Sequence, residues 1–82
     1  MTKEIIFISL PLCPKCVRVK HWLNELESSN PEIKITRLNY ATKTKEAKQY
    51  KIKNIPTLII GEVRLDGWIK EEEFQEALKK LL

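Results

Sequence analysis

The stretch Ile5-Ile6-Phe7-Ile8-Ser9-Leu10-Pro11-Leu12-Cys13-Pro14-Lys15-Cys16 decides the fold of this chain. Its first four residues form an unbroken β-branched and aromatic run, which is typical of a central strand buried on both faces. Leu10-Pro11-Leu12 ends that strand, and apolar residues at helical spacing follow at Cys16, Val19, Leu23 and Leu26. The sequence therefore predicts a strand over 5–8 and a helix over 14–28, which Asn30-Pro31 ends.

Three further strands and two further helices are predicted downstream. Residues 33–38 alternate apolar and polar side chains for most of their length, which indicates a second strand. Thr42 or Thr44 can cap a short helix that carries Ala47 and Tyr50, and the following Ile55-Pro56 prevents this helix from continuing.

The last third of the chain reads as a hairpin and a helix. Residues 57–60 and 63–65 predict two strands joined at Gly61-Glu62. From Lys70 onward apolar residues recur at helical spacing, with glutamates near the positive end of the helix and lysines near its negative end. A right-handed crossover makes the first two strands parallel. The order βαβ-ββα thus predicts an α/β fold in which a four-stranded mixed sheet carries helices on both faces.

Length and composition limit the classes of protein to consider. With 82 residues, the chain is expected to form a single domain over residues 1–82. Its net charge of +4 comes from scattered lysines, so no nucleic-acid partner is expected. The apolar segment 5–12 is too short for a bilayer and has no cleavage site, so we expect no membrane partner and no signal peptide. A monomer is expected.

The spacing of the cysteines carries the chemistry. Cys13 and Cys16 are the two cysteines of the chain. A small secreted protein would usually have several disulfides, so this low number favours a reducing compartment, the cytoplasm. Pro14 fits the first position of a helix, so Cys13 is expected at or near the N-cap, where unpaired N–H groups and Lys15 favour its thiolate. Cys13 is the predicted nucleophile and Cys16 the resolving thiol. The expected redox centre is the Cys13–Cys16 disulfide, with no cofactor and no metal.

Other uses of the two thiols stay open. A zinc half-site could combine both cysteines with His21, but closing it would require a second subunit. Iron–sulfur binding is a related alternative. A purely structural disulfide would close too short a loop to remove much unfolded-state entropy.

Beyond the Cys-x-x-Cys motif, Ile55-Pro56-Thr57 stands directly before a β run about forty residues downstream. With this combination the chain resembles the thioredoxin superfamily over nearly its whole length. The resemblance implies thiol–disulfide exchange with protein disulfides, a cis proline at Pro56 packed beside the dithiol, and pairing of the backbone of Ile55 with an extended substrate. The substrate-binding residues it implies are Pro14, Lys15, Ile55, Pro56, Thr57 and Gly67.

The chain combines features of two branches of the superfamily. Its length and Cys-Pro-x-Cys motif resemble glutaredoxins, whereas residues 50–58 and 61–67 resemble thioredoxins. Glutaredoxins hold glutathione with a Gly-Gly and a following Asp-Thr or Asp-Ser, where this chain has Asp66-Gly67-Trp68. The resemblance therefore favours a reductase, expected to be a flavoprotein, as the recycling partner, with a glutathione-dependent glutaredoxin as the alternative.

The sequence also departs from the thioredoxin pattern. Thioredoxins usually have Trp before the first cysteine, where this chain has Leu12, and an acidic residue in the central strand, where residues 5–8 have none. Trp68 is expected either to pack inside the protein or to line a partner surface. Arg18 is expected either to recruit acidic partners or to be a solvated edge of the helix.

Overall fold

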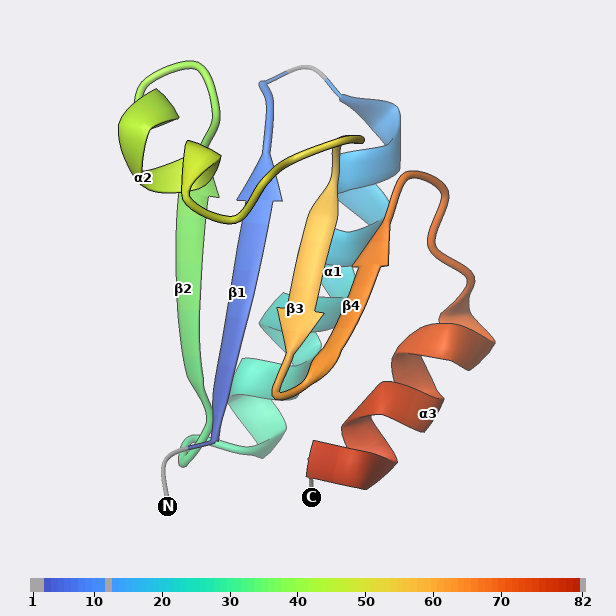
Figure 1. Ribbon diagram of the computed structural model, residues 1–82. Coiled ribbons are helices and arrows are strands. Elements are labelled where there is room, and N and C mark those ends of the chain that lie inside the picture. Colours follow the sequence, from blue (N-terminus) through green and yellow to red (C-terminus); the bar gives the residue numbers. More distant parts are fainter. Residues whose placement is uncertain (1–2, 12, 82) are drawn as a thin grey trace.

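The computed structural model describes residues 3–11 and 13–81, so Leu12 lies outside the described residues. The elements follow in the order β1 (Glu4–Ser9), α1 (Pro14–Ser29), β2 (Lys34–Asn39), α2 (Thr44–Lys48), β3 (Thr57–Ile60), β4 (Val63–Asp66) and α3 (Glu71–Leu81) (Figure 1). This order confirms the predicted succession of strands and helices. The observed bounds differ from the predicted ones by at most one residue, except in the short helix α2.

The four strands form one mixed sheet in the order β2-β1-β3-β4. β1 is parallel to β2 and antiparallel to β3, and β3 is antiparallel to β4. The crossover through α1 makes the parallel pair, and the tight turn after Ile60 makes the antiparallel hairpin. In the register, Ile8 is opposite Thr57, so the carboxyl end of β1 lies beside the start of β3. The predicted α/β fold with a four-stranded mixed sheet is confirmed.

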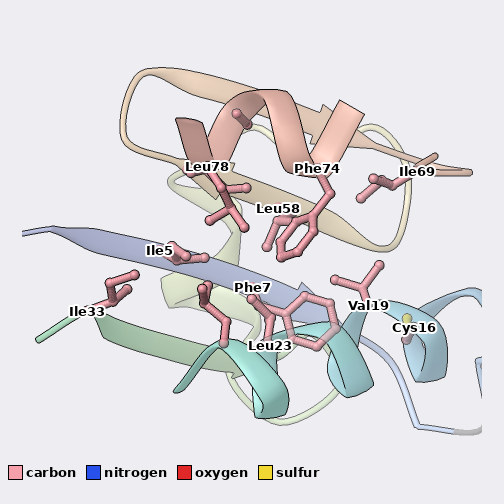
Figure 2. Close-up of a cluster of buried hydrophobic side chains, with 13 residues drawn as sticks. Ile5, Phe7, Cys16, Val19, Leu23, Ile33, Leu58, Ile69, Phe74 and Leu78 are labelled. Carbon is pink, nitrogen blue, oxygen red and sulfur yellow. The ribbon is translucent and has the colours of Figure 1, made fainter. Parts of the chain in front are cut away.

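Helices cover both faces of this sheet. α1 and α3 lie together on one face, where Phe7 and Leu58 point from the sheet into a cluster of buried apolar side chains (Figure 2). Ile8, the next residue along β1, points to the opposite face because side chains alternate along a strand, and it is also fully buried. On that face α2 lies beside β2 and contributes the buried Ala47 (Figure 1). This double burial explains why β1 has an unbroken apolar run.

The core holds α1 and α3 against each other. Leu23 of α1 is fully buried in the cluster, which stabilises the fold by roughly 1.5–3 kcal/mol relative to an exposed side chain. The rings of Trp22 and Phe74 stack at a centroid distance of 5.2 Å and so join the two helices directly. In residues 3–11 and 13–81, no helix is long and apolar enough to cross a membrane.

The predicted capping of the short helix is wrong. Lys43 is the N-cap residue of α2 and its side chain makes no capping hydrogen bond. Thr44 is already the first helical residue, and its hydroxyl donates instead to the carbonyl oxygen of Tyr40 at 2.6 Å. The helix also ends before Tyr50, because the chain turns at Lys51, which has a φ of +52°.

A side chain from β4 stabilises this early end of α2. Arg64 donates hydrogen bonds to the carbonyl oxygens of Tyr50 and Lys51. Those carbonyls therefore have a partner outside a helix, which removes one reason for the helix to continue. This contact joins residues 13 and 14 positions apart, so helical periodicity could not predict it.

Candidate redox site

The fold places Cys13 at the N-terminus of α1. Cys13 is the N-cap residue, with an extended backbone (φ −97°, ψ 112°), and Pro14 occupies the first helical position, as the sequence predicts. The carbonyl oxygen of Cys13 accepts the backbone N–H groups of Cys16 at 3.1 Å and Val17 at 3.2 Å, which closes the first turn. The Cys13 side chain therefore lies at the positive end of the helix dipole.

The two thiols differ in their access to solvent. Cys13 is partly exposed, whereas Cys16 is only 5% exposed and belongs to the buried cluster together with Val19 (Figure 2). Both cysteines are free thiols in this structure. A disulfide of another molecule can therefore reach Cys13 first, while Cys16 is shielded one helical turn further on.

Opposing effects act on the Cys13 thiol, and their net result favours the thiolate. Burial alone would raise the pKa of Cys13. Hydrogen bonds from the Cys16 thiol and from the backbone N–H groups of Cys16 and Lys15, together with the charge of Lys15, lower it by more. The pKa of Cys13 consequently lies below its ordinary value, in the direction that the sequence predicts.

The Cys16 thiol is affected in the opposite direction. Burial, the hydrogen bond that it donates to Cys13 and the negative charge on Cys13 raise the pKa of Cys16 to about 11, although the backbone N–H of Leu10 partly offsets this. Because one proton is shared between two adjacent sulfur atoms, stabilising the anion on Cys13 also keeps Cys16 protonated. The pair is therefore polarised, with the charge on the more exposed sulfur.

The proline segment lies at the same end of the sheet. The Ile55-Pro56 peptide bond is cis, as the resemblance implies. Thr57 is paired with Ile8 at the end of β1, and its hydroxyl donates to the carbonyl oxygen of Asn54 at 2.7 Å. Ile55 and Cys13 both pack against the buried cluster.

Gly67 connects the next loop to this proline segment. Its backbone N–H donates to the carbonyl oxygen of Pro56 at 3.0 Å. The structure thus brings residues 55–57 and Gly67 to the sheet end from which Cys13 and Pro14 begin α1. Lys15 is exposed in the first turn of that helix. The substrate-binding roles of these residues remain predictions.

For two residues near the site, Arg18 and Trp68, the structure excludes one of the two expected environments. Arg18 is not a solvated edge of the helix, because its guanidinium lies 4.8 Å from the ring centroid of Trp22 and 4.1 Å from that of Trp68. Trp68 is 56% exposed, so it is not an interior packing residue, whereas its neighbour Ile69 is 2% exposed and fills that role. The four-residue spacing of Arg18 and Trp22 could have indicated half of this contact.

The donors for a metal site are not gathered near the cysteines. Within residues 3–11 and 13–81, no group of three or more His, Cys, Asp or Glu residues could hold a metal ion. His21, the third candidate ligand, is exposed on α1 and lies 3.1 Å from the carboxylate of Glu25. A metal at Cys13 and Cys16 would therefore need ligands from another molecule.

The sheet order, the N-capping cysteine and the cis proline together define a thioredoxin-superfamily redox protein. In agreement with this class, the thioredoxin domain family matches residues 1–79. The chain belongs to that family.

Solved structures share the fold at low sequence identity. A malarial protein matches with a TM-score of 0.80 at 17% identity, covering 100% of this chain and 99% of that one. Thioredoxin-2 of the malaria parasite, a component of its protein secretion machinery, has a TM-score of 0.83 at 16% identity and coverages of 96% and 82%. Mitochondrial thioredoxin 3 from Saccharomyces cerevisiae, in its oxidized form, has a TM-score of 0.82 at 17% identity and coverages of 96% and 78%. A comparison with curated proteins found no match.

Proposed function

We propose that this protein is a thiol–disulfide oxidoreductase that reduces disulfides of other proteins, with Cys13 as the nucleophile and Cys16 as the resolving thiol. The observation that carries the proposal is the opposite direction of the two pKa shifts, downward for Cys13 and upward to about 11 for Cys16. Thiolates attack disulfides and thiols do not, so at neutral pH the exposed sulfur is the reactive one.

In the first step, the Cys13 thiolate attacks one sulfur of the substrate disulfide. A Cys13–substrate disulfide forms, the substrate disulfide breaks, and the other substrate sulfur leaves as a thiolate that takes a proton from water. The N–H groups at the start of α1 and the charge of Lys15 stabilise the attacking thiolate before the reaction.

In the second step, the Cys16 sulfur attacks the sulfur of Cys13. Its pKa falls before this attack, because Cys13 in the mixed disulfide no longer has the negative charge that helps to keep Cys16 protonated. Cys16 gives its proton to water, the Cys13–Cys16 disulfide forms as the Cys13–substrate bond breaks, and the second substrate sulfur leaves as a thiolate that takes a proton from water. Two electrons have then passed from the protein to the substrate.

Three further parts of the proposal concern partners and location. The substrates are disulfide-containing proteins, and the electrons that reduce the Cys13–Cys16 disulfide again come from a flavoprotein reductase. A glutathione-dependent cycle is the alternative. A reducing compartment, the cytoplasm, is consistent with a chain whose two cysteines form one redox pair.

Trapping the intermediate tests the proposed roles. The protein and its Cys13→Ser and Cys16→Ser variants are incubated with insulin and dithiothreitol, and with a disulfide-linked peptide analysed by mass spectrometry. We expect no reduction with Cys13→Ser and a stable peptide–Cys13 disulfide with Cys16→Ser. A mixed disulfide that forms on Cys16 in the Cys13→Ser variant, while none forms on Cys13 in the Cys16→Ser variant, would reverse the roles.

A further inference from the structure

Exposed apolar side chains gather at the dithiol end of the molecule. Among residues 3–11 and 13–81, the large apolar side chains that are exposed are Leu10, Val17 and Trp68. Leu10 and Val17 line a cavity together with both cysteines. Trp68 belongs to a different segment, the loop between β4 and α3. Burial does not explain why these residues are large and apolar.

Trp68 is fixed in place although more than half of it is exposed. The Arg18 guanidinium lies over two indole rings, 4.1 Å from the centroid of Trp68 and 4.8 Å from that of Trp22. The same guanidinium donates a hydrogen bond to the carbonyl oxygen of Ile69 at 3.2 Å. Trp22 in turn stacks on Phe74 of α3. The indole of Trp68 thus packs on the Arg18 side chain. Arg18 belongs to α1 and is fixed to the loop by its hydrogen bond with Ile69.

The exposed apolar side chains lie toward opposite edges of the sheet. The cavity that Leu10 and Val17 line also includes Asn39 of β2, whereas Trp68 follows β4, and β2 and β4 are the opposite edges of the sheet. Arg18 leaves α1 one turn after Pro14. Gly67, the residue before Trp68, is hydrogen-bonded to Pro56. Trp68 therefore follows a residue that is bonded to the proline segment and contacts Arg18 of α1.

We infer that Trp68 determines specificity at this site and that Arg18 is its positioning residue. The ligand is an extended segment of a disulfide-bearing protein that has a large apolar side chain next to its cysteine and an acidic side chain nearby. The apolar side chain packs on the indole of Trp68. The first turn of α1 contains no acidic residue that could pair with Lys15. The acidic side chain of the ligand therefore faces Lys15. This inference rests on the proposed function, because it concerns the substrate of the same site.

The test uses peptides in which one cysteine forms a disulfide with 2-nitro-5-thiobenzoate. Attack of Cys13 on the peptide sulfur releases the coloured thiolate, and the rate of release from reduced protein in a single turnover, measured over a range of peptide concentrations, gives the second-order rate constant. One peptide has Leu beside the cysteine and Asp two positions away, a second has Ser in place of Leu, and a third has Lys in place of Asp. We expect the first to react fastest, and its advantage over the second to fall about three- to tenfold in Trp68→Ala, through a higher half-saturating peptide concentration. Trp68→Phe retains most of the advantage.

The role of Arg18 has its own readout. In a Trp22→Phe background, acrylamide quenching reports on Trp68 alone, and Arg18→Ala is expected to increase the quenching and to reduce the preference for the Leu peptide. Lys79→Ala removes the same charge from the last turn of α3 and serves as the matched control. If the preference among peptides is the same in Trp68→Ala as in the unchanged protein, the inference is wrong.

A second measurement separates this inference from the proposed function. Serine versions of the peptides are titrated into protein with both cysteines replaced by serine and Trp22 by phenylalanine, so that the emission of Trp68 reports binding without thiol exchange. Binding that prefers Leu supports the inference even if no disulfide is ever reduced. Binding without that preference contradicts the inference, and absence of colour from every peptide contradicts only the proposed function.

Discussion

The backbone N–H of Gly67 donates to the carbonyl oxygen of Pro56, 3.0 Å away, and Gly67 makes this bond from a left-handed conformation with a φ of +68°. The bond ties the loop after β4 to the proline segment before β3, so that both lie beside the N-terminus of α1. A residue without a side chain reaches this conformation without a steric penalty. The position of Trp68 therefore depends on the backbone of the residue before it.

Gly67→Ala is expected to lower the free energy of unfolding by about 1 kcal/mol. The reason is conformational and not crowding, because an added Cβ would lie 3.7 Å from the nearest heavy atom, on Asn54, which is an ordinary contact. Chemical denaturation measures the change. Gly67→Asn should lower the free energy of unfolding by less, since asparagine tolerates the left-handed region. Equal stability of Gly67→Ala and the unchanged protein would contradict this account.

The two thiols should react with iodoacetamide in different pH ranges. Only the thiolate reacts, so each rate rises as pH increases through the pKa of its own thiol. The pKa of Cys13 is lowered by hydrogen bonds and by Lys15, which outweigh partial burial, and that of Cys16 is raised to about 11 by burial. Mass spectrometry at neutral pH should find Cys13 modified and Cys16 intact. Preferential labelling of Cys16 would show that Cys16, and not Cys13, has the lower pKa.

The charge of Lys15 should have a small but measurable effect on the nucleophile. It is the last of the causes that lower the pKa of Cys13, and its side chain is exposed, so water and salt screen it. Lys15→Glu is expected to raise this pKa and slow iodoacetamide labelling of Cys13 at pH 7 about two- to threefold at low salt. Lys79→Glu, the same charge change on α3, should leave the rate unchanged. An effect of Lys15→Glu that persists in 1 M salt would indicate another cause.

How much of the molecule is predictable from the sequence depends on the range of each interaction. The start of α1 is predictable, because the positions of Cys13 as N-cap and Pro14 as first helical residue depend only on residues next to them in the sequence. The contact of Arg18 with Ile69 joins residues 51 positions apart, so no periodicity within a segment reports it. The same holds for Arg64, which stabilises the early end of α2 through the carbonyl oxygens of Tyr50 and Lys51. Local patterns thus give the elements and the dithiol, but not the surface beside it.

The last prediction concerns the reductant: the protein should be recycled by a flavoprotein reductase and not efficiently by glutathione. Asp66-Gly67-Trp68 lacks the second glycine and the hydroxyl after aspartate that hold the glutamyl end of glutathione in glutaredoxins. The structure adds an electrostatic reason. The backbone N–H of Lys70 at the start of α3 already donates to the Glu73 carboxylate at 3.1 Å. The first turn of α3 contains three glutamates in total, which repel the carboxylates of glutathione.

Each hydrogen bond missing from such a site weakens binding by about 0.5–1.5 kcal/mol, and more for a charged group. Several missing bonds therefore reduce the affinity by orders of magnitude. The measurement compares turnover of hydroxyethyl disulfide with glutathione, glutathione reductase and NADPH against turnover with a thioredoxin reductase and NADPH. We expect the second system to be the faster. In a matched variant, replacing Glu71, Glu72 and Glu73 by glutamine should raise glutathione-driven turnover if repulsion contributes. Rapid glutathione-driven turnover of the unchanged protein would place its function with the glutaredoxins.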